Sequence, residues 1–290
     1  QSPTRCLTCI TQPVRQTGLP SPAHRSTLDT SAADAANDGM SQSHASTLQD
    51  TMDPAEVERF ARIAGEWWDP EGKFAPLHRL APARLGYLRD RIAGHFDRKL
   101  PATKPLAGLS LLDIGCGGGL VSEPLARLGA RMTGIDPAMD NISAARSHAA
   151  SSNLEIDYRA ERAEDLAARG DRFDVVLCLE VVEHVPKPGD FIAVAARLVR
   201  PGGLMIASTI NRTMKAWLLA IVGAEYVLRW LPAGTHRWDR FVTPDEMTRH
   251  MSAAGLRDIA FEGLVYNPLS DAWALSADTD VNYFASGSKP

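Results

Sequence analysis

The sequence has few cysteines, no long apolar stretch and little net charge, and each of these absences narrows the class of protein. Four cysteines in 290 residues are too few for a scaffold held by disulfides. No run of 18 apolar residues occurs, so no segment has the pattern of a membrane-spanning helix. A net charge of −4 does not supply the basic field that phosphate binding requires, so no nucleic acid is expected as a partner.

What is present is typical of a soluble globular protein. Apolar residues make up 44% of the chain and charged residues 23%, both ordinary values. Cys116 falls in a glycine-rich loop and Cys178 in a predicted buried strand, so both are expected to be free thiols in a reducing compartment. Cys6 and Cys9 form a lone CxxC pair without a partner pair, which we interpret as incidental.

The most informative stretch is Leu111–Gly119, LLDIGCGGG. An apolar run that contains Asp113 leads into a glycine loop, then a helix-like pattern, then a second apolar segment that ends in Asp136. This is the layout of a nucleotide site at the carboxyl end of a parallel sheet. Gly115 and Gly117 allow a sharp turn and a close approach to a ligand, and Asp136 can bind ribose hydroxyls.

The glycine spacing separates two kinds of nucleotide site. In a dinucleotide fingerprint the third glycine stands three residues after the second, a place that Leu120 occupies here. The pattern is instead D-x-G-x-G-x-G, which resembles motif I of class I S-adenosylmethionine-dependent methyltransferases. The resemblance implies a Rossmann-like α/β fold and S-adenosylmethionine as cofactor.

The composition changes near residue 51. Residues 1–51 are rich in Ser, Thr, Ala and Pro, and we expect a disordered tail. The tail is either sequence upstream of the true start, with Met40 or Met52 as initiator, or a transit peptide that would direct the chain to the mitochondrial matrix. Residues 52–290 are expected to form one methyltransferase domain, with a helical lid over 52–100 and a core over 105–290.

Along the core, segments with the apolar spacing of a strand alternate with segments that have the apolar spacing of a helix. This alternation predicts a mostly parallel seven-stranded sheet with helices on both faces and an antiparallel last strand. The expected strands are Ser110–Ile114, Arg131–Ile135, Ile156–Arg159, Phe173–Cys178, Leu204–Thr209, Ile259–Tyr266 and Asn282–Ser286. The expected helices start at Asp53-Pro54 and then cover about Pro82–Phe96, Gly119–Leu128, Met139–Ser151, Asp190–Leu198 and Thr243–Ala254. A tight turn is expected at Pro201-Gly202-Gly203.

Two carboxylates and an imidazole follow the fourth strand, in Glu180-Val181-Val182-Glu183-His184. Three roles are open for this cluster. Its oxygen and nitrogen donors could hold Mg²⁺ or another divalent ion. His184 or one of the glutamates could act as a general base on a phenol. Alternatively, Glu180 and Glu183 cap the following turn and His184 packs under it.

Two further segments have alternative interpretations. Glu164 and Asp165 follow the third strand, where one acid could accept from the exocyclic amine of adenine or simply be solvated. The insertion 211–237 is crowded with aromatic, aliphatic and basic residues. That mixture suits contact with a membrane surface or lipid, or an ordinary cap packed on the domain.

Several motifs resemble the ubiquinone-biosynthesis O-methyltransferases. They include WWDPEG from Trp67, PLHR from Pro76, EVVEHVPKP from Glu180, VGAEYVLRWLPAGTH from Val222 and DVNY from Asp280, and the resemblance covers about residues 53–286. It implies O-methylation of a 2-polyprenyl-6-hydroxyphenol and of a 3-demethylubiquinol. We also expect a cytoplasmic enzyme, peripheral at the inner face of the membrane, with a place in a quinone-synthesis complex.

The same resemblance implies site residues. Cofactor contacts fall on Arg84, Gly115, Asp136 and Leu179, beside Asp113 and Gly117 of the loop; Leu179 stands where some relatives have Met. A guanidinium at Arg84 could pair with the methionine carboxylate. Mitochondrial relatives use a divalent ion, and Glu180, Glu183 and His184 match that cluster.

Two other functions remain alternatives. One is an O-methyltransferase for another small phenol, whose activity would not depend on a polyprenyl tail. The other is a non-catalytic S-adenosylmethionine-binding scaffold of a quinone-synthesis complex, which would bind the cofactor without turnover.

Overall fold

The central sheet joins a parallel half to an antiparallel half. The structure, a computed structural model, describes residues 51–216, 238–267 and 272–290, which all belong to the unit Thr47–Pro290. The strands are β1 (Ser110–Ile114), β2 (Arg131–Ile135), β3 (Asp157–Arg159), β4 (Phe173–Leu179), β5 (Val199–Ile210), β6 (Arg257–Asn267), β7 (Ala272–Ser276) and β8 (Asn282–Ser288). Their order in the sheet is β3-β2-β1-β4-β5-β8-β6-β7. The first five pair in parallel, whereas β8 lies antiparallel between β5 and β6.

The predicted strands are all present, and the antiparallel last strand is confirmed. The sheet has eight strands and not seven, because β7 pairs antiparallel with β6 at the sheet edge. Most β7 side chains are at least partly exposed, so the segment carries no regular apolar alternation that would reveal a strand. The turn expected at Pro201-Gly202-Gly203 lies within β5, opposite a register shift in β4.

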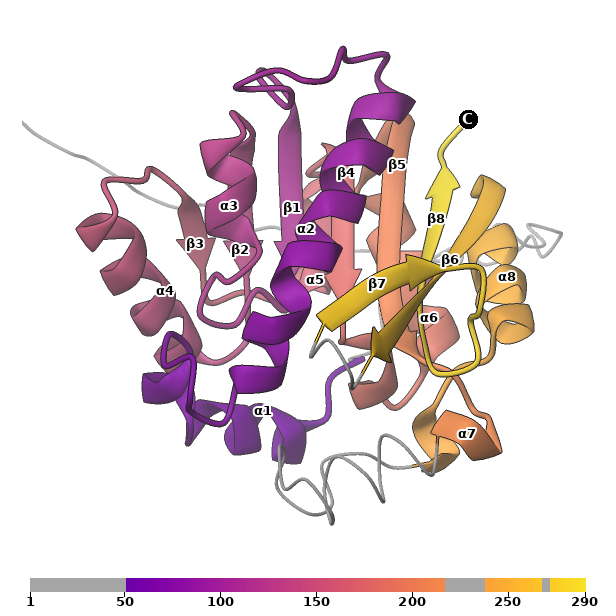
Figure 1. The fold of residues 1–290 in the computed structure, drawn as a ribbon, viewed down its shortest axis with the longest axis horizontal. Coiled ribbons are helices and arrows are strands. Elements are labelled where there is room, and N and C mark those ends of the chain that lie inside the picture. Colours follow the sequence, from indigo (N-terminus) through magenta and orange to yellow (C-terminus); the bar gives the residue numbers. More distant parts are fainter. Residues whose placement is uncertain (1–50, 217–237, 268–271) are drawn as a thin grey trace, which may run out of the picture. The chain divides into compact units, whose positions relative to one another are not determined.

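The parallel strands are buried on both faces, which is why they are almost wholly apolar. Successive residues alternate between two cores: Leu112 and Val176 pack toward α5, α6 and α8, and Leu111 and Val175 pack toward α2 and α3. Helices therefore cover both faces of the sheet, as predicted (Figure 1).

Most helices match the sequence pattern. They are α1 (Pro54–Ala61), α2 (Ala75–His95), α3 (Ser122–Arg127), α4 (Met139–Ser151), α5 (Ala163–Arg169), α6 (Pro188–Arg197), α7 (Met214–Ala216) and α8 (Pro244–Ala253), with 3₁₀ turns η1 (Ala64–Glu66), η2 (Val182–His184) and η4 (Trp238–Arg240). The capping box of α8 is confirmed: Thr243 Oγ1 accepts from Glu246 N at 3.2 Å, and Thr243 N donates to the Glu246 carboxylate at 3.0 Å.

Two helix expectations are corrected. Helix α2 begins at Ala75, with Pro76 in its first turn and Pro82 inside the helix. Because proline is favoured in the first turn of a helix, the sequence predicts a helix start at Pro82, and this prediction is wrong. The stretch around Glu164 and Asp165 is the first turn of α5 and not a loop; its seven residues are too few to show a helical period.

Of the two lid helices, α1 lies beside the ends of the parallel strands (Figure 1), whereas α2 crosses one face of the sheet. Asp53 caps α1, since its Oδ1 accepts from Ala55 N at 3.1 Å, as the sequence predicted. Trp67 and Phe74 stack with ring centroids 3.7 Å apart and form a small core with Ala64 and Leu120. This core fastens the lid onto the glycine loop.

Candidate active site

A cavity of about 350 Å³ opens where β1, β2 and β4 end. All nine site residues predicted from the sequence line it, together with the inner face of α1: Arg84, Asp113, Gly115, Gly117, Asp136, Leu179, Glu180, Glu183 and His184. Residues from the lid, the glycine loop and η2 therefore converge on one space, of the size usual for small-molecule sites.

The glycine loop has the geometry that the spacing predicts. Gly115 and Gly117 have φ angles of 72° and 51°, in the left-handed region that favours glycine. Both also lie against neighbours. A Cβ at Gly115 would come within 2.6 Å of Val181 Cγ2, and one at Gly117 within 2.3 Å of the Trp67 ring.

Asp136 is held in place by three donors. Its Oδ1 accepts from Ala138 N at 2.9 Å and from Asn141 Nδ2 at 3.1 Å, and its Oδ2 accepts from Gly117 N at 3.2 Å. The carboxylate is 7% exposed, and burial raises its pKa despite these bonds. A fixed acceptor at the end of β2 can receive hydroxyl groups of a ribose.

Asp113 stands deeper, at the end of β1. Its Oδ2 accepts from Ser122 Oγ at 2.7 Å. Burial raises the pKa of Asp113 to about 6; the Ser122 bond and the charge of Arg84 oppose that rise, and Asp136 adds to it.

This shift predicts a pH-dependent loss of stability. Between about pH 4 and 6 the unfolded chain has lost the Asp113 proton and the folded chain retains it, so the free energy of unfolding falls as the pH rises. Relative to Asp113→Asn, the wild type should lose roughly 2–3 kcal/mol between about pH 4 and 7. Urea unfolding at intervals of pH measures this difference.

Asp174→Asn is the matched control. Burial tends to raise the pKa of Asp174, but bonds from Ser110 and Arg200 outweigh it and lower that pKa. Removing the Asp174 carboxylate should change the pH dependence of the free energy of unfolding in the sense opposite to Asp113→Asn. Parallel pH curves for wild type and Asp113→Asn would contradict the raised pKa.

Arg84 brings a buried cation to the cavity. The residue is 3% exposed, and its Nε and Nη2 atoms have no hydrogen-bond partner in the structure. Burial lowers the pKa of the guanidinium, while the nearby acids Glu180 and Asp113 oppose this. A buried guanidinium with N–H groups to spare is suited to bind a ligand carboxylate.

The two glutamates after β4 differ in exposure: Glu183 is buried and Glu180 is half-buried. Glu180 has a φ of 55°, and its Oε1 accepts from Ser208 Oγ at 2.6 Å. Glu183 Oε2 accepts from Thr209 Oγ1 at 2.8 Å. Burial, and then the neighbouring Glu180, raise the pKa of Glu183. The buried Glu183 carboxyl therefore tends to keep its proton at neutral pH.

His184 turns toward the lid. Its Nδ1 lies 3.0 Å from Glu56 Oε2 on α1, and its ring packs edge-on against Phe60 at 5.3 Å between centroids. Contact with His184 lowers the pKa of Glu56 despite partial burial. In the tautomer protonated at Nδ1, the nitrogen that faces Glu56, Nε2 of the imidazole is the atom that can accept a proton.

The metal-binding set expected from Glu180, Glu183 and His184 is not formed. Each side chain is bonded to a different neighbour: Ser208, Thr209 and Glu56. In the part of the chain that the structure describes, no three His, Cys, Asp or Glu side chains gather as a potential metal site. The arrangement therefore does not fit a bound Mg²⁺.

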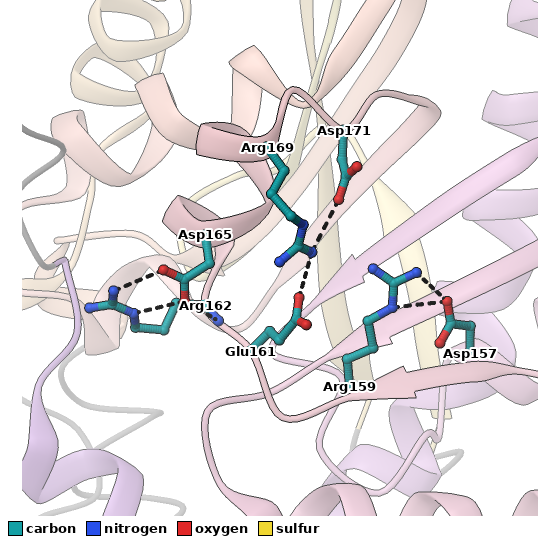
Figure 2. A network of polar contacts seen from close by, with 7 residues as sticks. All are labelled: Asp157, Arg159, Glu161, Arg162, Asp165, Arg169 and Asp171. Atoms are coloured by element: carbon teal, nitrogen blue, oxygen red, sulfur yellow. Dashed lines mark hydrogen bonds and ion pairs between the residues drawn. The ribbon is translucent and has the colours of Figure 1, made fainter. Parts of the chain in front are cut away.

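Glu164 and Asp165, the two acids considered for binding the adenine amine, differ in their surroundings. Glu164 lines the cavity, but its Oε1 accepts from the backbone and hydroxyl of Thr51 at 3.0 and 2.5 Å. Asp165 instead pairs with Arg162 at 2.9 and 3.1 Å, as Figure 2 shows. Asp165 thus belongs to the group of polar contacts drawn in Figure 2, in which Arg169 contacts both Glu161 and Asp171.

Several site residues escaped the sequence analysis. Trp67 was noted only as the start of the WWDPEG motif, and Thr51, Glu56 and Asn141 were not predicted as site residues. No local pattern marks them, because Thr51 contacts Glu164, Glu56 contacts His184 and Trp67 contacts Asn141, all far apart in the sequence. The insertion 211–237 lies mostly outside the described residues. Among the helices that are described, none is long and apolar enough to cross a membrane.

Comparison with known proteins gives the family. Residues 77–260 match the methyltransferase domain family. A ubiquinone biosynthesis O-methyltransferase of Azorhizobium caulinodans is 56% identical over 83% of this chain and 95% of its own length. A protein of the same name from Brucella anthropi is 53% identical over 84% of this chain and 98% of its own. The chain belongs to the ubiquinone biosynthesis O-methyltransferase family.

Solved structures support the fold of this O-methyltransferase family member. A methyltransferase from Thermotoga maritima, described as a possible histamine N-methyltransferase, has a TM-score of 0.58 at 17% identity, covering 81% of this chain and 99% of its own. Magnesium protoporphyrin IX methyltransferase from Synechocystis, solved with bound SAH (S-adenosylhomocysteine), has a TM-score of 0.57 at 19% identity, covering 82% and 95%. These two likenesses show the class I methyltransferase fold.

Proposed function

We propose that this chain methylates the hydroxyl groups of 2-polyprenyl-6-hydroxyphenol and of 3-demethylubiquinol, with S-adenosylmethionine as donor. The names of relatives at 53–56% identity support the pathway. The observation that carries the chemistry is the Glu56–His184 pair beside a cavity that also contains every predicted cofactor residue.

Cofactor binding is assigned to four features of the cavity. Arg84 binds the methionine carboxylate through its unpartnered N–H groups. Asp136 receives the ribose hydroxyls, Leu179 contacts adenine, and the Gly115–Gly117 backbone lies along the cofactor. The cofactor supplies an activated methyl group on its sulfonium, so the protein has mainly to align donor and acceptor.

His184 serves as the general base. As the phenol attacks, its O–H proton passes to Nε2 of the His184 imidazole. S-adenosylmethionine, when bound, would supply the methyl group to the phenol oxygen, with the electrons of the carbon–sulfur bond left on sulfur. Glu56 fixes the ring orientation and stabilises the imidazolium that forms. Glu180, close to Arg84, gives the cavity negative charge that favours a sulfonium.

No step is assigned to Mg²⁺, because the donor arrangement does not fit it. The finer proposals on partners are two: contact with the inner face of the membrane through 211–237, which rests on the composition of that insertion, and membership of a quinone-synthesis complex. The prenyl tail of the substrate makes lipid contact chemically reasonable.

The proposal is tested by transfer of labelled methyl from S-adenosylmethionine to a short-prenyl catechol, in parallel with an unprenylated catechol. Each reaction is run with Mg²⁺ and with chelator. We expect turnover in both conditions and a preference for the prenylated acceptor. Turnover only with Mg²⁺ would overturn the proposal that His184 acts as general base without a metal ion. Equal use of both acceptors would favour another small phenol, and cofactor binding without turnover would favour a scaffold.

A further inference from the structure

The WWDPEG motif of the lid has no part in the function proposed so far. Its first tryptophan, Trp67, is 8% exposed and lies flat against the glycine loop. A Cβ at Gly117 or Gly118 would come within 2.3 or 2.4 Å of that side chain. Packing of Trp67 therefore requires glycine at both positions, independently of any contact with the cofactor.

Trp67 is also joined to the ribose acid by hydrogen bonds. Its Nε1–H donates to Asn141 Oδ1 at 2.9 Å. The other end of that amide, Asn141 Nδ2, donates to Asp136 Oδ1 at 3.1 Å. Asn141 is 2% exposed, so neither bond competes with bulk water.

This chain of bonds determines the orientation of an amide. An asparagine side chain has a donor end and an acceptor end. Trp67 is only a donor and the Asp136 carboxylate only an acceptor, so the two partners select one orientation of Asn141. A flipped amide would place its oxygen against the carboxylate and its N–H₂ against the indole N–H. The indole thus keeps a donor directed at Asp136.

We infer that Trp67 is a positioning residue for the cofactor ribose, acting through Asn141 on Asp136. The lid thereby orients the carboxylate that receives the ribose hydroxyls, and loss of the indole N–H leaves Asn141 free to turn. The inference rests on the ribose role proposed for Asp136.

The test compares two ligands by calorimetry, S-adenosylhomocysteine and its 2′,3′-dideoxyribose analogue. Wild type should bind the analogue roughly tenfold or more weakly, because Asp136 loses its hydroxyl partners. Trp67→Phe keeps a ring on the glycine loop and removes the N–H. It should reduce that ratio by about threefold or more. Asn141→Ala should reduce it likewise, and tests the relay even if Trp67→Phe does not fold.

Trp68→Phe is the matched control. Trp68 also belongs to the motif and also donates an indole N–H, but to the Gly118 carbonyl at 2.9 Å. Its substitution should weaken both ligands equally and leave their ratio unchanged. An unchanged ratio in Trp67→Phe or Asn141→Ala would overturn the relay alone. Equal wild-type affinity for the two ligands would overturn the ribose role of Asp136 and the relay with it.

Discussion

His184→Gln should lower kcat by roughly two to four orders of magnitude while leaving the affinity for S-adenosylhomocysteine within about twofold. Glutamine keeps a polar side chain in the cavity but cannot accept the phenol proton at neutral pH. Nothing assigned to the cofactor rests on the imidazole, so binding should be spared. Steady-state methyl transfer measures kcat, and calorimetry measures the affinity.

Glu56→Gln tests the same pair from the lid. It removes the charge that faces Nδ1 at 3.0 Å and should lower kcat by a smaller factor, about 10- to 100-fold, because the base survives without its orienting partner. His250→Gln, on α8 and outside the cavity lining, controls for the loss of a histidine and should retain kcat. Recovery of the His184→Gln enzyme by added Mg²⁺ would contradict the base role.

Arg84→Met is expected to weaken S-adenosylhomocysteine binding by about 30-fold or more, since removing one partner of a buried charged contact typically costs 2–5 kcal/mol. Methionine approximates the apolar stem and deletes the guanidinium. Affinity for 5′-methylthioadenosine, which lacks the amino-acid portion, should be nearly unchanged. Calorimetry with both ligands distinguishes a lost carboxylate contact from general damage to the cavity.

Arg91→Met is the matched control for this prediction. It lies two turns further along α2, where its Nε donates to Ser286 Oγ at 2.9 Å, and it does not line the cavity. Neither affinity should change in this variant. If Arg84→Met loses affinity for both ligands by the same factor, Arg84 shapes the cavity and does not bind the carboxylate.

Features governed by the local chain were predictable from the sequence. The glycine loop, Asp136 after the second strand and the Thr243 capping box depend on backbone sterics and on hydrogen bonds within a few residues. The buried parallel strands follow from their continuous apolar runs. These patterns predicted that the glycine loop, Asp136 and the Glu180–His184 cluster lie together, because the carboxyl ends of parallel strands meet at one edge of the sheet. Arg84 and Leu179 were predicted only through the family resemblance.

Pairings between distant parts of the chain were decided only by the tertiary structure. It turned His184 toward Glu56 and away from the glutamates beside it, so the metal-binding set suggested by their spacing is not formed. The tertiary structure also pairs Thr51 with Glu164 through a hydrogen bond and packs Trp67 on the glycine loop. It adds the strand β7, which pairs with β6 at the edge of the sheet. Spacing along a chain specifies which side chains can be neighbours within a turn or a strand. Which of several available partners a side chain takes depends on how the lid packs on the sheet, and that is set by burial over the whole domain.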